Sequence, residues 1–316
     1  MVLSRHLTII MNKQIFDNSR PNAIMTKARP IITRFAPSPT GFLHLGHAYS
    51  ALLSERQALT SGGQFLLRIE DIDIKRTKPE FEKAIIEDLT WLGLKWEGKI
   101  RRQSDHFDEY EKVIKELKER NLIYPCYCSR KEIRAEIQNA SMAPHDTFPS
   151  SVGPIYPGTC RSLTEKQSKK RNNLGHSFAL RLNSTLALQI TNKTDGPLIW
   201  NDFEKGIILA SLDHLGDVVL ARKETPASYH LAVTLDDHLQ GVNFVTRGLD
   251  LFSSTHVHRV LQALLKLNTP TYYHHHLLRG ADGQKFSKRN NSLTIRSLRG
   301  DGKTPSEVRL MAGFKD

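Results

Sequence analysis

The segment Arg34-Phe-Ala-Pro-Ser-Pro-Thr-Gly-Phe-Leu-His-Leu-Gly-His47 is the strongest indication of the fold. It follows a short apolar run and leads into an expected helix, where backbone N–H groups and the positive end of the helix dipole attract an anion. Gly41 and Gly46 allow close backbone approach, and Gly46 leaves room for an adenine or ribose. His44 and His47 share one face of the first helical turn, so both can donate hydrogen bonds to a phosphoryl oxygen. The alternative is two histidines at a helix start with no ligand.

The sequence beyond this segment alternates short apolar runs with helical stretches. Strand-like runs are expected at residues 65–69, 217–220 and 242–246, and helices at residues 48–59, 79–89, 109–120 and 254–267. This alternation, with Gly-rich junctions, predicts an α/β fold with a parallel sheet. A loop-rich insertion is expected between Asn139 and Cys160, because four prolines interrupt that stretch.

A second basic segment, Lys285-Phe-Ser-Lys-Arg289, follows the Gly-rich stretch Gly280-Ala-Asp-Gly-Gln284. A flexible loop carrying Lys285, Lys288 and Arg289 can close over a triphosphate and stabilise the charge that develops as pyrophosphate departs. A short basic run of this kind can also be only a solvated surface.

Composition limits the classes of protein to which the chain can belong. It has 316 residues, 39% of them hydrophobic and 25% charged, which excludes wholesale disorder and fibrous repeats. The formal net charge of +12 favours a polyanionic partner such as nucleic acid, although solubility alone can explain it. Three cysteines do not form a disulfide scaffold, and no apolar run of about 18 residues predicts a membrane span. We therefore expect a cytoplasmic protein, with residues 1–30 a disordered or misassigned extension.

Together, the two signatures resemble those of class I aminoacyl-tRNA synthetases. The segment from Arg34 to Gly41 resembles the corresponding sequence of the glutamyl branch. The resemblance runs from about Ile31 to about Leu293. Further matching motifs are Leu67-Arg-Ile-Glu-Asp-Ile-Asp73, Arg76-Thr-Lys-Pro79, Asp88-Leu-Thr-Trp-Leu-Gly-Leu94, Leu239-Gln-Gly-Val242 and Thr246-Arg-Gly248.

Three features distinguish the chain from ordinary members of that branch. Only 27 residues follow Arg289, too few for a helical anticodon-binding domain. The first signature ends in Gly46-His47 rather than Gly-Gly, and the insertion carries Cys126-Tyr-Cys128 and Tyr156-Pro-Gly-Thr-Cys160. These features resemble the glutamyl-queuosine tRNA(Asp) synthetase family, a truncated paralogue. Leu249 and the three histidines from His274 to His276 depart from the usual pattern of the branch.

The resemblance implies a Rossmann-like parallel-sheet catalytic domain with an inserted zinc-bearing subdomain, a small C-terminal helical segment and no anticodon-binding domain. The expected divisions after the extension are the first catalytic half (31–120), the insertion (121–215), the second catalytic half (216–270) and the signature-loop and C-terminal segment (271–316).

The resemblance also implies the site residues. The glutamate site would comprise Arg34, Phe35, Ala36, Pro37, Ser38, Glu70, Tyr229 and Arg247, and the ATP site His44, Gly46, His47, Lys285 and Lys288, with Mg²⁺ accompanying ATP. Of these, His44, His47 and Lys288 would stabilise the phosphoryl transition state. Two separated arginines suit a substrate with two carboxylates, because a guanidinium binds a carboxylate bidentately. The alternatives are a capping or surface role for Glu70 and a structural role for Arg247.

A structural zinc site is expected from the cysteines. Cys126 and Cys128 can chelate one ion from a turn, and Cys160 returns from the proline-rich loop. The resemblance implies Tyr156 as the fourth ligand, whereas His145 and His176 are more ordinary chemical candidates. Three free buried cysteines are the alternative.

The expected function is ATP-dependent activation of L-glutamate and transfer of the glutamyl group to queuosine in tRNA(Asp), by a monomer. The alternatives are a truncated glutamyl-tRNA synthetase that charges a tRNA 3′ end, and a catalytically inactive tRNA-binding paralogue. Two basic runs, residues 160–171 and 285–303, are expected to flank the active-site mouth and grip the tRNA.

Overall fold

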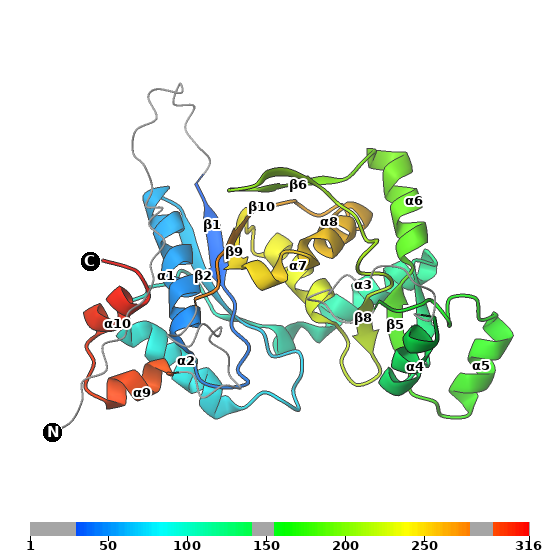
Figure 1. The fold of residues 1–316 in the computed structure, drawn as a ribbon, viewed down its shortest axis with the longest axis horizontal. Coiled ribbons are helices and arrows are strands. Elements are labelled where there is room, and N and C mark those ends of the chain that lie inside the picture. Colours follow the sequence, from blue (N-terminus) through cyan, green and yellow to red (C-terminus); the bar gives the residue numbers. More distant parts are fainter. Residues whose placement is uncertain (1–29, 141–154, 279–292, 316) are drawn as a thin grey trace.

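The computed structural model describes residues 30–140, 155–278 and 293–315, so the predicted extension, except Pro30, lies outside it. One layer of strands runs through the catalytic part (Figure 1). Its strands are β1 (Ile32–Phe35), β2 (Gln64–Ile69), β3 (Arg101–Arg102), β6 (Ile199–Asp202), β7 (Gly206–Leu209), β9 (Phe244–Gly248) and β10 (Thr271–His275). The pairings β1–β2, β2–β3, β9–β10 and β10–β6 are parallel, and β6–β7 is antiparallel. The predicted α/β fold is therefore confirmed, with pairings that are parallel except where the edge strand β7 joins β6 antiparallel.

Asn243 holds β1 beside β9. Its N–H donates to the Ile32 carbonyl at 3.0 Å, and its side-chain oxygen accepts from the Ile32 N–H at 2.8 Å. The chain proceeds outward from β1 to β2 and β3 on one side, and from β9 to β10 on the other. The strand order thus reverses between β1 and β9, and in open α/β sheets ligands bind at the carboxyl ends of strands at such a point.

Helices cover both faces of this layer and bury its apolar side chains. They are α1 (Leu45–Thr60), α2 (Pro79–Trp91), α3 (Phe107–Glu119), α7 (Tyr229–Leu239) and α8 (Ser254–Leu264), with short 3₁₀ turns at Gln103–His106 and Leu249–Leu251. The largest cluster includes Leu43, Leu52, Phe65, Leu67 and Leu89, which come from α1, β2, α2 and the turn before α1. Gly63 is required where α1 turns into β2, because a Cβ there would lie 1.9 Å from the Ile31 carbonyl oxygen.

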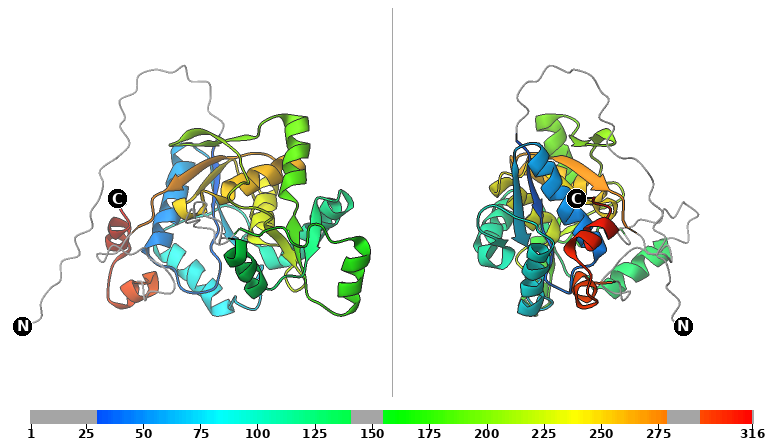
Figure 2. Two further views of the ribbon diagram at one scale, coloured as in Figure 1. Left: turned by 45° about the vertical axis from the view of Figure 1, so that its right-hand side comes forward. Right: turned by 90° about the vertical axis from the view of Figure 1, so that its left-hand side faces the viewer.

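The insertion forms a second unit of structure with its own sheet. Its elements are β4 (Ile123–Cys126), α4 (Arg130–Ala140), α5 (Glu165–Asn173), β5 (Ala179–Leu182), α6 (Ser184–Asp195) and β8 (Val219–Arg222). The strands β4, β5 and β8 pair antiparallel, so the predicted strand at 217–220 starts two residues later and belongs to this sheet. Figure 2 shows α5 projecting at the end of the molecule away from the chain's C-terminus.

Two short C-terminal helices, α9 (Ile295–Gly300) and α10 (Pro305–Met311), pack against the other end of the molecule. Their Ile295, Leu298 and Val308 join the cluster formed by α1 and α2, and Phe314 completes it. This agrees with the predicted C-terminal helical segment. Across the three described ranges, no helix combines the length and apolar character that crossing a bilayer requires.

Candidate active site

The His44–His47 turn lies at the start of α1, beyond the carboxyl end of β1. Helix α1 starts at Leu45 rather than at the predicted residue 48, because His44 caps it. His44 Nδ1 accepts from the Gly46 N–H at 3.1 Å, and His47 Nδ1 accepts from the His44 N–H at 3.1 Å. The rings stack with centroids 3.7 Å apart. A neutral imidazole whose Nδ1 accepts carries its proton on Nε2, so each ring has Nε2–H as its donor. The prediction that both histidines share one face is confirmed.

The polypeptide that follows the basic signature is joined to this turn. Thr294 forms an antiparallel bridge with His44, and the Ile295 N–H donates to the Leu43 carbonyl at 2.8 Å. The Arg296 guanidinium stacks over the Phe42 ring at 5.1 Å. Lys285, Lys288 and Arg289 themselves lie outside the described residues.

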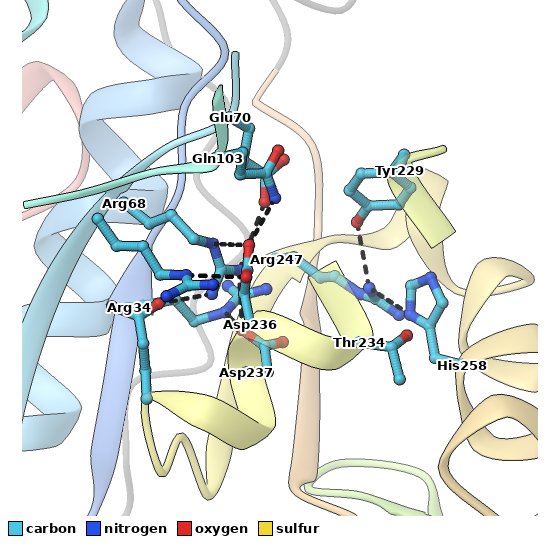
Figure 3. Close-up of polar contacts among 12 residues, drawn as sticks. Arg34, Arg68, Glu70, Gln103, Tyr229, Thr234, Asp236, Asp237, Arg247 and His258 are labelled. Atoms are coloured by element: carbon cyan, nitrogen blue, oxygen red, sulfur yellow. Dashed lines mark hydrogen bonds and ion pairs between the residues drawn. The ribbon is translucent and has the colours of Figure 1, made fainter. Parts of the chain in front are cut away.

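A buried ionic cluster centres on Asp237 of α7 (Figure 3). Arg34 Nε and Arg68 Nη2 both bind Asp237 Oδ1, at 2.9 and 2.8 Å. Burial disfavours the Asp237 carboxylate, but the two guanidinium groups outweigh it and lower the pKa of Asp237. Arg34 Nη1 also donates to the Thr246 carbonyl at 3.3 Å, directly before Arg247 on β9. The charge of Arg34 is therefore balanced by Asp237, and its guanidinium group lies next to the backbone that leads to Arg247.

The neighbouring Asp236 has its own partners. Arg101 Nε, Gln103 Nε2 and the Tyr110 hydroxyl donate to its carboxylate at 2.8, 2.8 and 3.0 Å. The roles of Arg68, Asp236 and Asp237 were missed by sequence reasoning. The available signal was a pair of adjacent carboxylates in the mostly buried helix α7, where buried carboxylates need cationic or hydrogen-bonding partners.

Glu70 lies directly after β2 and is 9% exposed, so it is neither a surface carboxylate nor a helix cap. Its N–H donates to the Pro37 carbonyl at 3.0 Å, which joins the end of β2 to the 34–38 segment. Its carboxylate lies 3.4 Å from Arg68 Nη2. Burial raises the pKa of Glu70, and Arg68 and Arg34 only partly offset this effect. A further cation beside Glu70 would therefore stabilise its carboxylate form.

Arg247, at the end of β9, is 5% exposed and contacts neutral groups. Its Nη1 lies 3.3 Å from the Tyr229 hydroxyl and 3.2 Å from His258 Nδ1, as Figure 3 shows. Its Nη2 donates to the Thr255 hydroxyl. Burial and the Arg247 charge hold the pKa of His258 well below its usual range, so this histidine is neutral. Among the described residues, no carboxylate forms an ion pair with Arg247.

His274 of β10 orients Arg247 from the other side. Its Nε2 accepts from Arg247 Nε at 3.1 Å, while its Nδ1 lies 2.7 Å from Asp202 Oδ2. Burial and Arg247 lower the pKa of His274 to about 4, despite the opposing effect of Asp202. Asp202 thereby fixes the tautomer that leaves Nε2 as an acceptor. His274 belongs to the histidine run that departs from the usual pattern, and its contribution here was not predicted.

The structure brings Arg34, Glu70, Tyr229 and Arg247 together: Arg34, Glu70 and Arg247 lie near the carboxyl ends of β1, β2 and β9, and Tyr229 begins α7. The side chain of Phe35 differs, because it is 7% exposed and packs in the main hydrophobic cluster. Its contribution to a ligand site would come from its backbone. Ala36, Pro37 and Ser38 form the loop that continues from β1, in which Thr40 N–H donates to the Ser38 carbonyl at 2.8 Å.

The three cysteines converge at the end of β4. Their sulfur atoms all lie within 4.8 Å of one another, and Cys128 Sγ is 3.4 Å from Cys160 Sγ. The Tyr156 hydroxyl lies 3.7 Å from Cys128 Sγ and accepts from the Cys160 N–H at 2.8 Å. Within the described ranges, no histidine, aspartate or glutamate joins this group, so His176 is not part of it; His145 lies outside those ranges.

The three sulfur atoms lie close enough together to bind one tetrahedrally coordinated zinc ion. With Zn–S bonds of about 2.3 Å, neighbouring sulfurs would be about 3.8 Å apart. Burial and the hydrogen bond with Cys160 raise the pKa of the Cys128 thiol to about 12. A bound divalent cation would reverse this preference by favouring the thiolates.

Comparison with known proteins identifies the family. Residues 30–312 match the family model for the catalytic domain of class I tRNA synthetases (E and Q). The chain is 43% identical over 290 residues to Glutamyl-Q tRNA(Asp) synthetase from Rhodobacter capsulatus, covering 90% of this chain and 100% of that protein. It is 40% identical to the protein of that name from Nocardia farcinica, covering 87% of this chain and 81% of that one.

Ordinary synthetases match over part of their length. Glutamate–tRNA ligase from Aquifex aeolicus is 36% identical, with 87% of this chain covering 55% of that one. The crystal structure of glutamate-tRNA synthetase from Elizabethkingia anophelis matches with a TM-score of 0.73 at 26% identity, covering 90% of this chain and 61% of that one. The chain therefore belongs to the glutamate and glutamine branch of the class I aminoacyl-tRNA synthetases and, within it, to the family of the glutamyl-Q tRNA(Asp) synthetases.

Proposed function

We propose that this enzyme activates L-glutamate with ATP and transfers the glutamyl group to queuosine in the anticodon of tRNA(Asp). The observation that carries the choice of amino acid is Arg247, a buried cation with no carboxylate partner among the described residues. An unpaired buried charge is costly, and a substrate carboxylate bound bidentately would neutralise it. Glu70, whose pKa is raised by burial, is suited to receive the substrate ammonium group.

The reaction follows from these positions in two steps. An oxygen of the substrate α-carboxylate attacks the α-phosphorus of ATP, and pyrophosphate leaves to give glutamyl-adenylate. A hydroxyl group of the queuosine ring then attacks the activated carbonyl, loses its proton, and displaces AMP. Nε2–H groups of His44 and His47 would donate to phosphoryl oxygens, together with Lys288, while Mg²⁺ accompanies ATP as part of the substrate. The bridge between Thr294 and His44 supports this assignment, because it anchors the chain after the basic signature at the same turn.

The choice of acceptor rests on the relatives. The match to the protein from R. capsulatus covers that protein completely, whereas matches to glutamate–tRNA ligases cover little more than half of theirs. This favours queuosine of tRNA(Asp) over the alternative of a tRNA 3′ end. We expect the enzyme to act in the cytoplasm, where its tRNA substrate is found, and to be a monomer.

We also propose that Cys126, Cys128 and Cys160 hold one structural zinc ion, with Tyr156 as the fourth ligand. The ion would fasten the segment around Cys160 to the end of β4. No chemical step passes through it.

Two measurements test the proposed function. ATP–pyrophosphate exchange with glutamate and without tRNA should proceed, and its absence would exclude tRNA-independent activation and favour the inactive tRNA-binding alternative. Labelled glutamate should then transfer to tRNA(Asp) that contains queuosine and not to the same tRNA without it. Periodate treatment of the tRNA should abolish the transfer. Equal transfer to both tRNA preparations would instead indicate charging of the 3′ end.

A further inference from the structure

A basic cavity lies between the insertion and the catalytic domain, next to the amino-acid site. Its volume is about 550 Å³, and we call it the arginine cavity because Arg130, Arg134, Arg181 and Arg222 line it. Ligand-binding cavities are typically of this order of size. Tyr229 also lines it, so the cavity borders the residue whose hydroxyl contacts Arg247.

Three of these guanidinium groups have no partner among the described residues. The side chains of Arg130, Arg134 and Arg222 are exposed, and none forms an ion pair or hydrogen bond with another described residue. Arg130 and Arg134 are four residues apart on α4 and therefore lie on the same face of that helix, one turn apart. Arg222 is the last residue of β8. Unpaired arginines from separate elements around one cavity are expected where an anion binds at several points.

The base of the cavity is aromatic and polar. The Arg181 guanidinium stacks over the Tyr156 ring at 3.9 Å, and its Nη1 donates to the Asp217 carbonyl at 2.7 Å. Arg181 Nε and the Ser228 hydroxyl are buried and find no partner among the described residues. The one acidic side chain of the lining, Asp217, is already paired with Arg161 at 2.7 Å. The lining therefore has an excess of donors and positive charge.

We propose that the arginine cavity receives the sugar–phosphate backbone beside the nucleotide that accepts the glutamyl group. This inference rests on the proposed function, since the acceptor must approach the activated carbonyl near Arg247. Planar guanidinium forks bind phosphates bidentately, and unstacked bases of single-stranded RNA stack on tyrosine and arginine planes. A small polyanion such as ATP is not favoured, because the predicted phosphate site at the His44–His47 turn lies on other elements.

The test compares a double variant, Arg130→Ala with Arg134→Ala, with a charge-matched control. Lys118→Ala with Lys193→Ala removes two exposed lysines from the last turns of α3 and α6, away from the cavity. Three quantities are measured: pyrophosphate exchange without tRNA, KM for queuosine-containing tRNA(Asp), and the affinity for its labelled anticodon stem-loop by fluorescence anisotropy. Circular dichroism and thermal melting establish that the variants fold.

The cavity variant should raise KM and Kd for RNA roughly 10- to 100-fold, because two charged hydrogen bonds are lost and solvent weakens each of them at these exposed positions. The log–log salt slope of binding should become less steep by about 0.7 for each phosphate contact removed. Exchange should stay within about twofold of the parent, and the control should leave all three quantities unchanged. Arg→Lys at both positions should restore the salt slope but only part of the affinity.

Three results would overturn the inference. One is parent-like RNA affinity and slope in the cavity variant; another is an equal loss in the lysine control. The third is a parallel fall in exchange, which would make the cavity a support for the amino-acid site. If the parent binds the stem-loop through these arginines but transfers nothing to it, the proposed function fails and the cavity assignment stands. If the parent transfers and the variant matches it, only the cavity assignment fails.

Discussion

At the scale of single residues, the two site arginines differ in their electrostatic state. Arg34 is paired with Asp237, whereas Arg247 contacts neutral histidine, tyrosine and threonine side chains. Both are almost completely buried. Sequence reasoning assigned a substrate carboxylate to each of two arginines. The proposed carboxylate receptor is Arg247, because no carboxylate among the described residues forms an ion pair with it.

Replacing Arg247 by lysine should impair glutamate use although the charge is retained. An ammonium group cannot make two parallel hydrogen bonds to a carboxylate, and it cannot contact His258, His274 and Tyr229 together. We expect KM for glutamate in pyrophosphate exchange to rise roughly 10- to 100-fold, corresponding to one charged hydrogen bond. Arg259→Lys, on the neighbouring α8, is the matched control. Unchanged glutamate kinetics in the Arg247 variant would show that this arginine is structural.

The buried histidines around Arg247 should make stability depend on pH. Burial and the Arg247 charge lower the pKa of both His230 and His274 to about 4. In the unfolded chain a histidine titrates near 6.5, so below this pH the unfolded state binds protons that the folded state does not. The free energy of unfolding should therefore fall as pH drops from about 6.5 to 4, by up to roughly 1.4 kcal/mol per pH unit for each histidine.

Urea unfolding at several pH values measures this dependence. In His230→Gln, the slope of the unfolding free energy against pH should be smaller than in the parent by the equivalent of about one proton between about pH 4 and 6.5. The other titrating groups contribute equally to both slopes and cancel in the comparison. The exposed His176→Gln should leave the slope unchanged. A His230 variant with the parent's slope would contradict the assignment.

At the scale of elements, the cysteine group joins segments that few apolar contacts hold. Cys126, Tyr156 and Cys160 form a small cluster of their own, separate from the main cores. Tyr156 also lines the arginine cavity, so an ion at the cysteines would hold one wall of that cavity in place. The cysteine group and the proposed RNA site thus share Tyr156.

Purified protein should contain about one zinc ion per chain, measured by elemental analysis. Cys128→Ser should abolish the zinc and lower the midpoint of thermal unfolding by roughly 3–6 °C. Transfer to tRNA should weaken more than pyrophosphate exchange, because the cavity wall belongs to the insertion. Ser129→Ala, next to the site, serves as a control that retains the metal. A metal-free parent with three reactive thiols would favour the free-cysteine alternative.

At the scale of the whole molecule, the described helices of the two predicted basic runs lie at opposite ends. Figure 1 places α5, which carries the first run, at one end of the long axis and α9, from the second, at the other. In the described part of the second run, Arg299 lies 3.7 Å from Asp88 and Lys303 lies 2.8 Å from Glu307. Lys285, Lys288 and Arg289 of the second run lie outside the described residues, so the expectation that both runs flank the active-site mouth stays a prediction.

Salt should affect the two half-reactions differently. We expect KM for tRNA to increase steeply with ionic strength, with a log–log slope of about 0.7 to 0.9 per phosphate contacted. Glutamate activation should change little, because its site is small and buried. Reversing Lys170 and Arg171 on α5 to glutamate should weaken transfer and spare exchange, with Lys303→Glu on the opposite end as control. If transfer is insensitive to both salt and charge reversal, the tRNA binds a different face.

The sequence by itself determined the family and the α/β class, because signature motifs and the alternation of strands and helices are local features of the chain. The site positions Arg34, Glu70, Tyr229 and Arg247 came from the resemblance to the family and stay predictions. The cysteine spacing likewise predicted a group that the structure brings together.

Only the tertiary structure decided how these residues are held and which of them keep an unpaired charge. Asp237, Asp202 and His274 act on arginines distant in the sequence, through pairings that depend on how β6, β9, β10 and α7 pack. The arginine cavity combines α4, β5 and β8 with the start of α7. A side chain's charge state depends on burial and on partners brought close by folding, and neither quantity is encoded in the spacing of residues along the chain.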